Sequence, residues 1–583
     1  MGASCGFTDV QYSSPKISAR RLVGKAACCV QTMKTKIWLL SLACGVGTSL
    51  AATNAAPSWP KADPAAVARW QAMRFGMFIH WGPVSLTGRE IGWSRGGNQT
   101  PIEVYDNLYQ QFNPTNYNAD EWVSVAKAAG MKYIVLTTKH HDGFCLWDTK
   151  HTDYNIMNTP FKRDVVKELA GACKRQGIAF GAYYSTCDWY HPDFPLTSPG
   201  GRVRREKSDI DSYQRFLLAQ IRELITNYGP LITIWNDVPQ EFKGRGAATI
   251  RMVRELQPDI LINDRTGDGG DYSTPEQRVG KYQDDRPWET CMTLCQQWAW
   301  KPNDDMKSLK QCLQTLVTCA AGDGNLLFNV GPMPDGVIEP RQVARLKEMG
   351  DWLAKNGESI YGTRGGPWKP TPSVASTRKG STVYLHLLRE DDGAVELPAL
   401  SRKVTRASLL GGGAVKYEQS DGKLRLSFDK AAIDPIDTII RLELDGSAMD
   451  VPAISVASGI KASASNVFQK QNGQYGPQQA FDNDSHTRWA TDSGTKQAWI
   501  AADLGKPLTI QRVRIEEALG ERVQKFEFQY RDGQEWKTIF TGQKIGHWFQ
   551  KKFDQPVTAQ EFRLNILDAT DGPTLNDIEL IEK

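Results

Sequence analysis

The feature that most constrains this chain is an alternation, from about residue 60 to 360, of short apolar segments with amphipathic segments of helical period. The apolar segments, which we predict to be strands, are Phe75–His80, Tyr133–Thr137, Ile178–Tyr184, Leu231–Trp235 and Ile260–Asn263. The intervening helices are expected at Ala119–Ala129, Val165–Gln176 and Asp211–Tyr228. This pattern is typical of parallel strands joined by crossover helices. We therefore predict a (β/α)8-like barrel over residues 56–365.

The rest of the chain reads as β structure. Alternating apolar runs separated by Gly- and Asp-containing turns predict a β-sandwich over residues 366–450, and a second strand-rich unit follows over residues 455–583. A chain of 583 residues is too long for one hydrophobic core, because single cores stop growing at roughly 250–300 residues. The expected fold class is multidomain: a barrel followed by two β-sandwich domains.

Residues 1–55 are predicted to be a leader with a signal peptide. Met33 is a plausible start, followed by two lysines, the apolar run Ile37–Val46 and small residues ending at Ala52. That order of charge, apolar core and cleavage site is typical of a secretory signal. We therefore expect an exported protein, periplasmic or secreted. Cys44 leaves open a lipid anchor, and we expect no other membrane association.

The net charge of the chain belongs to its leader. Six basic residues and one acidic residue lie in residues 1–55, so this segment alone has a formal charge of +5, whereas the whole chain has +4. The remainder is therefore close to neutral and has no basic stripe. Nucleic acid is excluded as an expected partner, because nucleic-acid-binding surfaces concentrate Lys and Arg.

Two carboxylates are candidates for chemistry. Asp237 follows the apolar strand Leu231–Trp235, at the end of the barrel where enzymes of this fold place their active sites. Its alternative role is a helix N-cap or an ion-pair partner. Glu289 follows Trp288, and an apolar neighbourhood would raise its pKa as a general acid requires. Tryptophans crowd the strand ends, where they could stack on sugar rings or simply belong to the core.

Six motifs, in order along some 300 residues, resemble the glycoside hydrolase family 29 α-L-fucosidases. They lie at residues 74–82, 133–149, 183–185, 264–276, 288–293 and 325–335. The resemblance implies a retaining exo-α-L-fucosidase that acts by double displacement, with Asp237 as nucleophile and fucosylated oligosaccharides or glycoproteins as substrates. It also implies substrate-binding roles for His80, Trp81, Glu90, Trp93, His140, His141, Tyr184, Trp235 and Arg265.

The acid/base position varies within this family, and here several acids stay open for the role. We favour Glu289 over Glu276, Asp284 and Asp285. Where many relatives have a Trp-Gly pair, this chain has Trp298-Ala299-Trp300, so the linkage preference is not fixed by the sequence. The competing functions are a non-catalytic fucosyl-glycan-binding protein and an α-L-galactosidase. No catalytic metal or other cofactor is expected, because His140 and His141 are adjacent and lack a zinc-type ligand set.

Residues 455–583 resemble the discoidin-like, coagulation factor 5/8 type C modules, to which family 32 carbohydrate-binding modules belong. The motifs are Ala480–Ala490, Trp499–Gly505 and Asn576–Leu580. The resemblance implies a structural calcium held by Ala480, Asp482, Asp484, Thr487 and Glu579. Oxygen ligands in a tight turn suit calcium, although an ordinary Asp/Asn turn would have the same composition. Whether this module binds sugar stays open.

Overall fold

The structure is a computed structural model that describes residues 59–583 apart from 97–98, 196–204, 206, 389–392, 457–459, 483, 485–486, 547 and 583. The predicted leader at residues 1–55 lies outside the described residues. No helix within the described part of the chain has the length and the apolar character needed to cross a bilayer.

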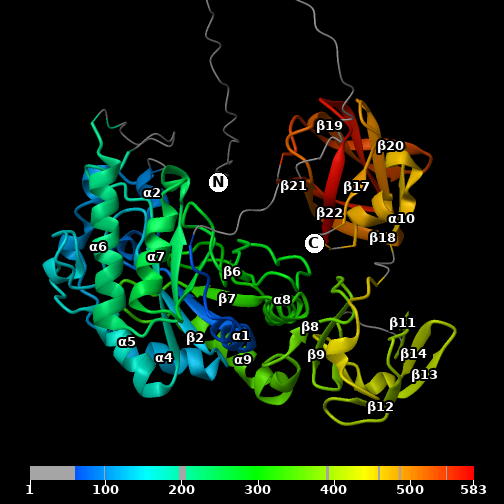
Figure 1. Ribbon diagram of the computed structural model, residues 1–583, viewed down its shortest axis with the longest axis horizontal. Coiled ribbons are helices and arrows are strands. Elements are labelled where there is room, and N and C mark those ends of the chain that lie inside the picture. The colour runs from blue at the N-terminus through cyan, green and yellow to red at the C-terminus, as the bar shows by residue number, and fades with distance from the viewer. Residues whose placement is uncertain are drawn as a thin grey trace, which may run out of the picture. The chain divides into compact units, whose positions relative to one another are not determined.

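A parallel sheet forms the centre of the first domain (Figure 1). Its strands are β1 (Phe75–Ile79), β2 (Tyr133–Lys139), β3 (Ala179–Ser185), β4 (Thr233–Asp237), β5 (Leu261–Ile262), β6 (Glu289–Thr293) and β7 (Asn325–Val330). They are arranged in the order β5-β4-β3-β2-β1-β7-β6, and every pair is parallel. Almost every strand residue is buried, as expected for a parallel sheet covered on both faces.

The segment between the edge strands closes the sheet. Tyr272 pairs with Asn263 beyond β5, while Ser273 and Glu276 pair with Trp288 and Cys291 on the β6 side. Residues 272–276 therefore occupy the place of an eighth strand between β5 and β6. The predicted (β/α)8-like barrel is confirmed in this form, as a curled seven-stranded parallel sheet completed by one irregular segment.

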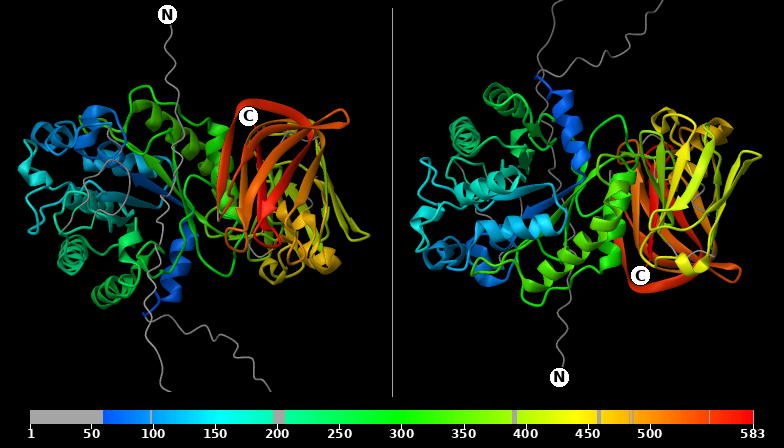
Figure 2. Two further views of the ribbon diagram at one scale, coloured as in Figure 1. Left: turned by 90° about the horizontal axis from the view of Figure 1, so that it is seen from above. Right: turned by 90° about the horizontal axis from the view of Figure 1, so that it is seen from below.

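Helices surround the outside of this sheet in both views of Figure 2. The longer ones are α1 (Pro64–Met73), α4 (Ala119–Ala128), α5 (Val165–Gln176), α6 (Ile210–Tyr228), α7 (Gly246–Leu256), α8 (Leu309–Ala321) and α9 (Pro340–Asn356). The short ones are η1 (Pro83–Thr87), α2 (Trp93–Gly96), α3 (Ile102–Tyr105), η2 (Leu108–Gln111), η3 (Ile156–Asn158), η4 (Gln240–Phe242) and η5 (Gly357–Ser359). Side-chain caps from Asn118, Asp164 and Asp209 begin α4, α5 and α6 close to the positions expected from the sequence.

The barrel has two distinct apolar layers, and this division places the functional residues. The inner layer includes Phe78, Tyr133, Tyr183, Trp235 and Cys291. The outer layer lies between sheet and helices and contains the alternate strand residues. Because successive strand side chains point to opposite faces, a residue and its immediate neighbour on a strand fall in different layers.

Two further groups of β-strands follow the barrel. The first contains β8 (Arg364–Gly365), β9 (Val374–Lys379), β10 (Thr382–Leu387), β11 (Ala394–Pro398), β12 (Val404–Leu409), β13 (Lys416–Ser420), β14 (Lys423–Ser427), β15 (Thr438–Leu444), η6 (Lys430–Ala432) and η7 (Ala448–Asp450). They form sheets ordered β12-β15-β10-β9-β8 and β11-β14-β13 around one apolar core.

The last domain has its own core, rich in phenylalanine. Its elements are β16 (Lys461–Ala464), η8 (Phe468–Lys470), α10 (Asn472–Tyr475), η9 (Pro477–Ala480), β17 (Trp489–Ala490), β18 (Ala498–Glu517), β19 (Val523–Asp532), β20 (Glu535–Gly542), β21 (Phe549–Ala569) and β22 (Thr574–Glu582). All its pairs are antiparallel, in the order β17-β22-β18-β21-β19-β20 with β16 on β18. Register shifts within β18 and β21 bend these long strands around the core.

Candidate active site

The carboxyl ends of the barrel strands bring together most of the polar residues expected there. The His140 ring centroid lies 5.6 Å from that of His80 and 3.8 Å from that of His141. His141 Nε2 lies 3.8 Å from Asp237 Oδ2, and Arg265 Nη1 lies 2.8 Å from Asp237 Oδ1. These residues come from several separate segments of the chain, and they meet because parallel strands end at one edge of the sheet.

Asp237, the last residue of β4, has several hydrogen-bond donors. Tyr183 donates its hydroxyl to Oδ2 at 2.8 Å, and Arg265 Nη1 and the Val238 amide donate to Oδ1 at 2.8 and 2.9 Å. Burial would raise the pKa of this carboxyl, but the Arg265 charge, the His141 ring and the hydrogen bonds outweigh it and hold the pKa below its ordinary value. Asp237 is therefore ionised at neutral pH.

Arg265 connects Asp237 to a second carboxylate, Glu276. The same Nη1 nitrogen donates to Asp237 Oδ1 at 2.8 Å and to Glu276 Oε2 at 2.9 Å. The separation of those two oxygens cannot exceed the sum of the distances, about 5.7 Å. Thr274 holds the guanidinium through two bonds of 2.9 Å, and the guanidinium carbon lies 4.8 Å from the centre of the Trp235 ring. Glu276 is partly exposed, so it can reach a bound molecule.

Glu289, which the sequence favoured as acid/base, does not lie beside Asp237. It is the first residue of β6, whereas Asp237 is the last residue of β4. The two therefore lie at opposite ends of the parallel strands, Glu289 at the amino end and Asp237 at the carboxyl end. Its carboxyl is buried and accepts hydrogen bonds from the Tyr133 hydroxyl and from Trp235 Nε1. Burial raises its pKa to about 7. Glu289 thus has the raised pKa expected from the sequence, but its carboxyl lies in the barrel interior, away from Asp237.

The pairing of the closing segment explains the difference between the two glutamates. Glu276 pairs with Cys291, two residues further along β6 than Glu289. Each strand residue advances about 3.3 Å, so Glu276 lies about 7 Å nearer than Glu289 to the carboxyl end of the strands, where Asp237 lies. Asp284 and Asp285, also considered as the acid/base, lie further along the same segment, and Asp284 accepts a bond from Tyr282 at 3.0 Å.

Two residues expected to bind substrate belong to the outer layer instead. Trp81 is buried against Phe112 and Trp122, and its indole donates to the Met333 carbonyl at 3.0 Å. Tyr184 donates its hydroxyl to Gln220 of α6 at 2.8 Å. Both predictions are corrected, because neighbouring side chains on a strand point to opposite faces. His80, which precedes Trp81, faces the site, and Tyr183, which precedes Tyr184, contacts Asp237.

Glu90 supports the site through backbone contacts. Its carboxylate accepts hydrogen bonds from the amides of Trp298 and Ala299 at 2.9 and 3.0 Å. The Trp298 carbonyl in turn accepts a bond from Asn329 Nδ2 at 2.8 Å, and Asn329 Oδ1 lies 2.6 Å from His80 Nδ1. Glu90 thus fixes the loop that places the Trp298 ring 4.8 Å from the His80 ring. Asn329 and Trp298 were missed as site residues, although Asn329 lies within one of the six motifs and Trp298 lies just beyond another.

Trp93 lies at the mouth of the site. Its side chain is among the exposed large hydrophobics, and its ring is 5.3 Å from that of His141 and 5.4 Å from that of Trp189. An exposed indole next to hydrogen-bonding histidines is a suitable stacking surface for the C–H face of a sugar. Trp235, by contrast, is buried and stacks on Tyr183 at 5.5 Å. It forms the floor of the site.

Two of the site histidines, His80 and His140, are neutral at neutral pH. Burial lowers the pKa of His80 to about 3 and lowers that of His140 well below its ordinary value. A neutral imidazole has one donor and one acceptor, which suits the hydroxyl groups of a sugar. Among the described residues, no group of three or more His, Cys, Asp or Glu side chains could hold a metal ion.

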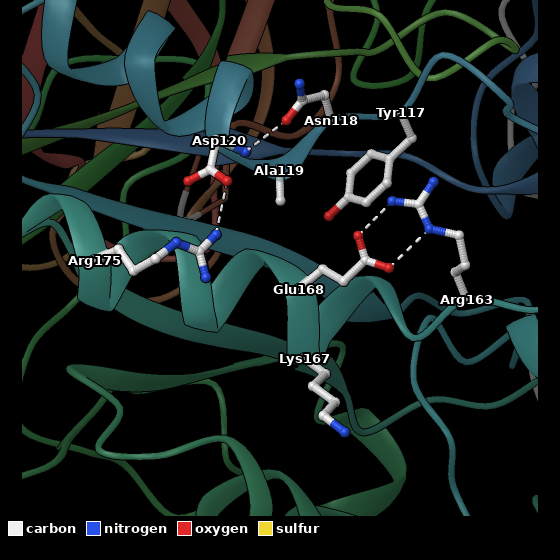
Figure 3. A pocket seen from close by; sticks show the side chains of 8 residues that line it. All are labelled: Tyr117, Asn118, Ala119, Asp120, Arg163, Lys167, Glu168 and Arg175. Carbon is white, nitrogen blue, oxygen red and sulfur yellow. Dashed lines mark hydrogen bonds and ion pairs between the residues drawn. The ribbon is translucent and has the colours of Figure 1, made fainter.

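A hollow of about 400 Å³ lies elsewhere on the barrel, between α4 and α5. Figure 3 shows the side chains that line it. Four of its five charged side chains form two ion pairs, Arg163 with Glu168 at 2.5 Å and Arg175 with Asp120 at 2.7 Å, and the fifth, Lys167, is exposed. A hollow whose charges are mostly compensated by neighbours has no evident preference for a charged ligand. The strand-end cluster is therefore the candidate active site.

The loop expected to hold calcium is oxygen-rich. The Thr487 hydroxyl lies 2.9 Å from both carboxylate oxygens of Asp482, 3.2 Å from the Asp484 carbonyl and 3.4 Å from the Gln479 carbonyl. Ala480 is buried beside them, and Gln479 Oε1 is buried without a hydrogen-bond partner. Burial raises the pKa of Asp482 to about 6. Oxygen atoms of this kind fit calcium.

Glu579, expected to complete that ligand set, is half exposed and pairs with Arg514 of β18 at 2.9 Å. Asp577, on the same face of β22, is the more buried carboxylate. Burial raises its pKa to about 7, and the charge of Asp482 contributes to this. Asp577, which lies 3.8 Å from Lys281 Nζ, was not among the ligands expected from the sequence.

Comparison with known proteins is consistent with both parts of this architecture. Residues 42–358 match the alpha-L-fucosidase family model, and residues 460–580 match the F5/8 type C domain. Human plasma alpha-L-fucosidase is 30% identical over 406 residues, which cover 62% of this chain and 85% of the relative. Human tissue alpha-L-fucosidase is 30% identical over 408 residues, covering 63% and 86%.

Solved structures give the same result. Alpha-L-fucosidase isoenzyme 1 from Paenibacillus thiaminolyticus is 35% identical with a TM-score of 0.61, covering 65% of this chain and 99% of its own. A family 29 alpha-L-fucosidase from Bacteroides thetaiotaomicron, trapped as a covalent intermediate with 2-fluoro-fucosyl fluoride, is 26% identical with a TM-score of 0.60, covering 66% and 97%. Because the matched model spans more than half of the 583 residues, the chain belongs to the alpha-L-fucosidase family and carries an F5/8 type C domain at its C-terminal end.

Proposed function

We propose that this protein is a retaining exo-α-L-fucosidase that releases L-fucose from fucosylated oligosaccharides or glycoproteins. The observation that carries the proposal is the pair of carboxylates, Asp237 and Glu276, bound to one nitrogen of Arg265. Retaining glycosidases have their two carboxyl groups about 5–5.5 Å apart, whereas inverting enzymes need about 6.5–9.5 Å to admit a water. The upper limit of about 5.7 Å between these two oxygens favours retention.

In the first step Asp237, ionised, attacks the anomeric carbon and forms a fucosyl ester. The bond from that carbon to the leaving-group oxygen breaks, and Glu276 gives its proton to this oxygen. In the second step Glu276, now ionised, takes a proton from water as the water attacks the anomeric carbon. L-Fucose leaves and Asp237 is regenerated as a carboxylate.

The neighbouring residues hold the sugar during both steps. Neutral His80 and His140 are suited to bind ring hydroxyls, and Trp93 and Trp298 provide apolar surface beside them. Arg265 stabilises the ionised form of whichever carboxylate is charged. The Bacteroides relative that was trapped as a covalent intermediate supports the two-step route.

The test is hydrolysis of 4-nitrophenyl α-L-fucoside, followed by proton NMR for the anomer formed first. We expect release of fucose with the α configuration, and a fall of several orders of magnitude in kcat for Asp237→Ala. A first product of β configuration would contradict retention. A folded wild-type protein that releases no fucose from aryl or oligosaccharide substrates would refute the activity.

We further propose that a calcium ion stabilises the loop at Asp482 and Thr487, with export directed by residues 1–55. The oxygen cluster of that loop supports the first proposal. The second rests on the order of charged, apolar and small residues from Met33 to Ala52. Sequencing the N-terminus of the mature protein from culture medium or periplasm tests the export; a start before Cys44 would contradict it.

A further inference from the structure

The residue that follows Asp237 has an unusual backbone conformation. Val238 has a φ of +51°, in the left-handed region. Of the nine non-glycine residues with positive φ in the described part of the chain, it is the only β-branched one. A β-branched side chain is sterically disfavoured there, and Pro239 further biases the residue before it towards an extended conformation. Such strain persists only where surrounding contacts impose it, and it concentrates at functional sites.

This conformation has a direct effect on the Asp237 carboxylate. The positive φ goes with the orientation of the Asp237–Val238 peptide group, because turning a peptide plane changes the ψ of the residue before it and the φ of the residue after it together. In this orientation the Val238 N–H points towards the preceding side chain and donates to Asp237 Oδ1 at 2.9 Å. Oδ1 is the same oxygen that accepts the bond from Arg265. Two donors on one oxygen and the Tyr183 hydroxyl on the other fix the carboxylate plane. If this peptide group flipped, Val238 would return to a negative φ, the N–H would point away from Oδ1, and one of the three hydrogen bonds would be lost.

The contacts that impose the conformation come from Thr186, just beyond the end of β3. Its amide donates to the Asp237 carbonyl at 2.9 Å. Its hydroxyl lies 2.7 Å from the Asp237 carbonyl and 2.6 Å from the Val238 carbonyl, so it bridges the two peptide groups on either side of the Val238 φ and ψ angles. Thr186 is buried, and water does not compete for these bonds.

We infer that Thr186 is a positioning residue for Asp237: its hydroxyl holds the Asp237–Val238 peptide group in the orientation that gives Val238 a positive φ and points the Val238 N–H at Oδ1. The inference rests on the proposed role of Asp237 as nucleophile. A carboxylate free to rotate would meet the anomeric carbon less often in the attacking geometry, and small misplacements cost as much as about 100-fold in rate. Loss of an N–H bond to the charged form also favours protonation.

The experiment compares Thr186→Val with wild type on 4-nitrophenyl α-L-fucoside across the pH range. We expect kcat to fall about 10- to 100-fold with KM changed less than about threefold, and the acid limb of kcat/KM to move to higher pH. Thr186→Ser keeps the hydroxyl and should stay within about threefold of wild type. Thr363→Val is the matched control, since Thr363 is also buried and its hydroxyl binds the Ile360 carbonyl at 2.7 Å away from the site.

A second substitution tests the mechanism itself. Glycine adopts a positive φ without strain, so Val238→Gly in the Thr186→Val background should recover at least about tenfold of the lost kcat. A wild-type kcat and acid limb in Thr186→Val would overturn the inference. So would an equal loss in Thr363→Val, or a double variant no more active than Thr186→Val.

Crystal structures separate this inference from the proposed activity. In Thr186→Val we expect Val238 to leave the left-handed region and its N–H to leave Asp237 Oδ1. Retention of a positive φ in that variant would overturn the inference, whatever the substrate of the enzyme. A wild type without fucosidase activity would refute the proposed function and leave this structural comparison decisive for the role of Thr186.

Discussion

The carboxylates of Asp237 and Glu276 accept hydrogen bonds from one nitrogen atom, Nη1 of Arg265, at 2.8 and 2.9 Å. A shared donor holds the two carboxylates in a fixed relation to each other, so that both can face the same bound molecule. This relationship identifies the partner of Asp237 on geometric grounds, and it separates Glu276 from Glu289.

The first prediction concerns the two glutamates. Glu276→Gln should lower kcat at least about 100-fold on substrates with poor leaving groups and much less on 2,4-dinitrophenyl fucoside, because only a poor leaving group needs the proton. Sodium azide should restore turnover of Glu276→Gly by forming fucosyl azide. Glu289→Gln should show neither leaving-group dependence nor rescue. Azide rescue of Glu289→Gly, with none for Glu276→Gly, would reverse the assignment.

Substitution of Tyr183 should lower activity, whereas substitution of its neighbour on β3, Tyr184, should affect only stability. Tyr183→Phe removes the hydroxyl that binds Asp237 Oδ2, so kcat should fall about tenfold or more and the acid limb of kcat/KM should move to higher pH. Tyr184→Phe removes a bond to Gln220 in the outer layer. It should cost about 1 kcal/mol of stability and leave kcat unchanged. Equal kinetic losses in the two variants would contradict the assignment of Tyr183 to the site.

Gly92 should tolerate no side chain. It has a φ of +62°, and a Cβ atom there would lie 2.7 Å from His140 Nδ1. Gly92→Ala should therefore displace the His140 ring and raise KM several-fold. Gly380→Ala is the matched control, because Gly380 has a φ of +58° with nothing within 4 Å of a Cβ atom. It should lose about 1 kcal/mol of stability and no activity. Unchanged kinetics in Gly92→Ala would show that His140 does not need its present position.

Glu289 should make stability depend on pH. Its pKa is raised by burial from 4.5 to about 7 in the folded protein. Below about pH 4.5 both folded and unfolded states are protonated, and between pH 4.5 and 7 only the folded state keeps the proton. Folding therefore loses stability as pH rises through this window, by about 3 kcal/mol in total.

Glu289→Gln should remove this loss, so the melting temperature of the variant should rise relative to wild type from about pH 5 to about pH 7. Thermal unfolding at half-unit pH intervals measures the difference. A constant difference across the window would show that Glu289 is ionised in the folded protein.

Calcium removal should act on the C-terminal domain alone. EDTA is expected to lower the melting temperature of that domain, and added calcium should restore it. Asp482→Asn should abolish the response, because it removes a carboxylate that lies within the oxygen cluster. Asp568→Asn, at an exposed position of the same domain, is the control. A melting temperature that ignores both EDTA and calcium would exclude a structural calcium.

The sequence by itself determined the architecture and the approximate place of the chemistry. Strand and helix periods predict the barrel, and parallel strands must end at one edge, so His80, His140, His141, Asp237 and Arg265 were expected to meet. These conclusions need only local pattern and chain direction.

Only the tertiary structure decided which side chains face the site. Trp81 and Tyr184 lie within motifs of the family, but each is one residue out of phase with the inner layer. Glu289 has the environment of a general acid, but it is the first residue of β6 and therefore lies at the opposite end of the strands from Asp237. Glu276 reaches Asp237 because its segment pairs with Cys291 between the edge strands. Strand register is set by long-range packing, and no local pattern of residues records it.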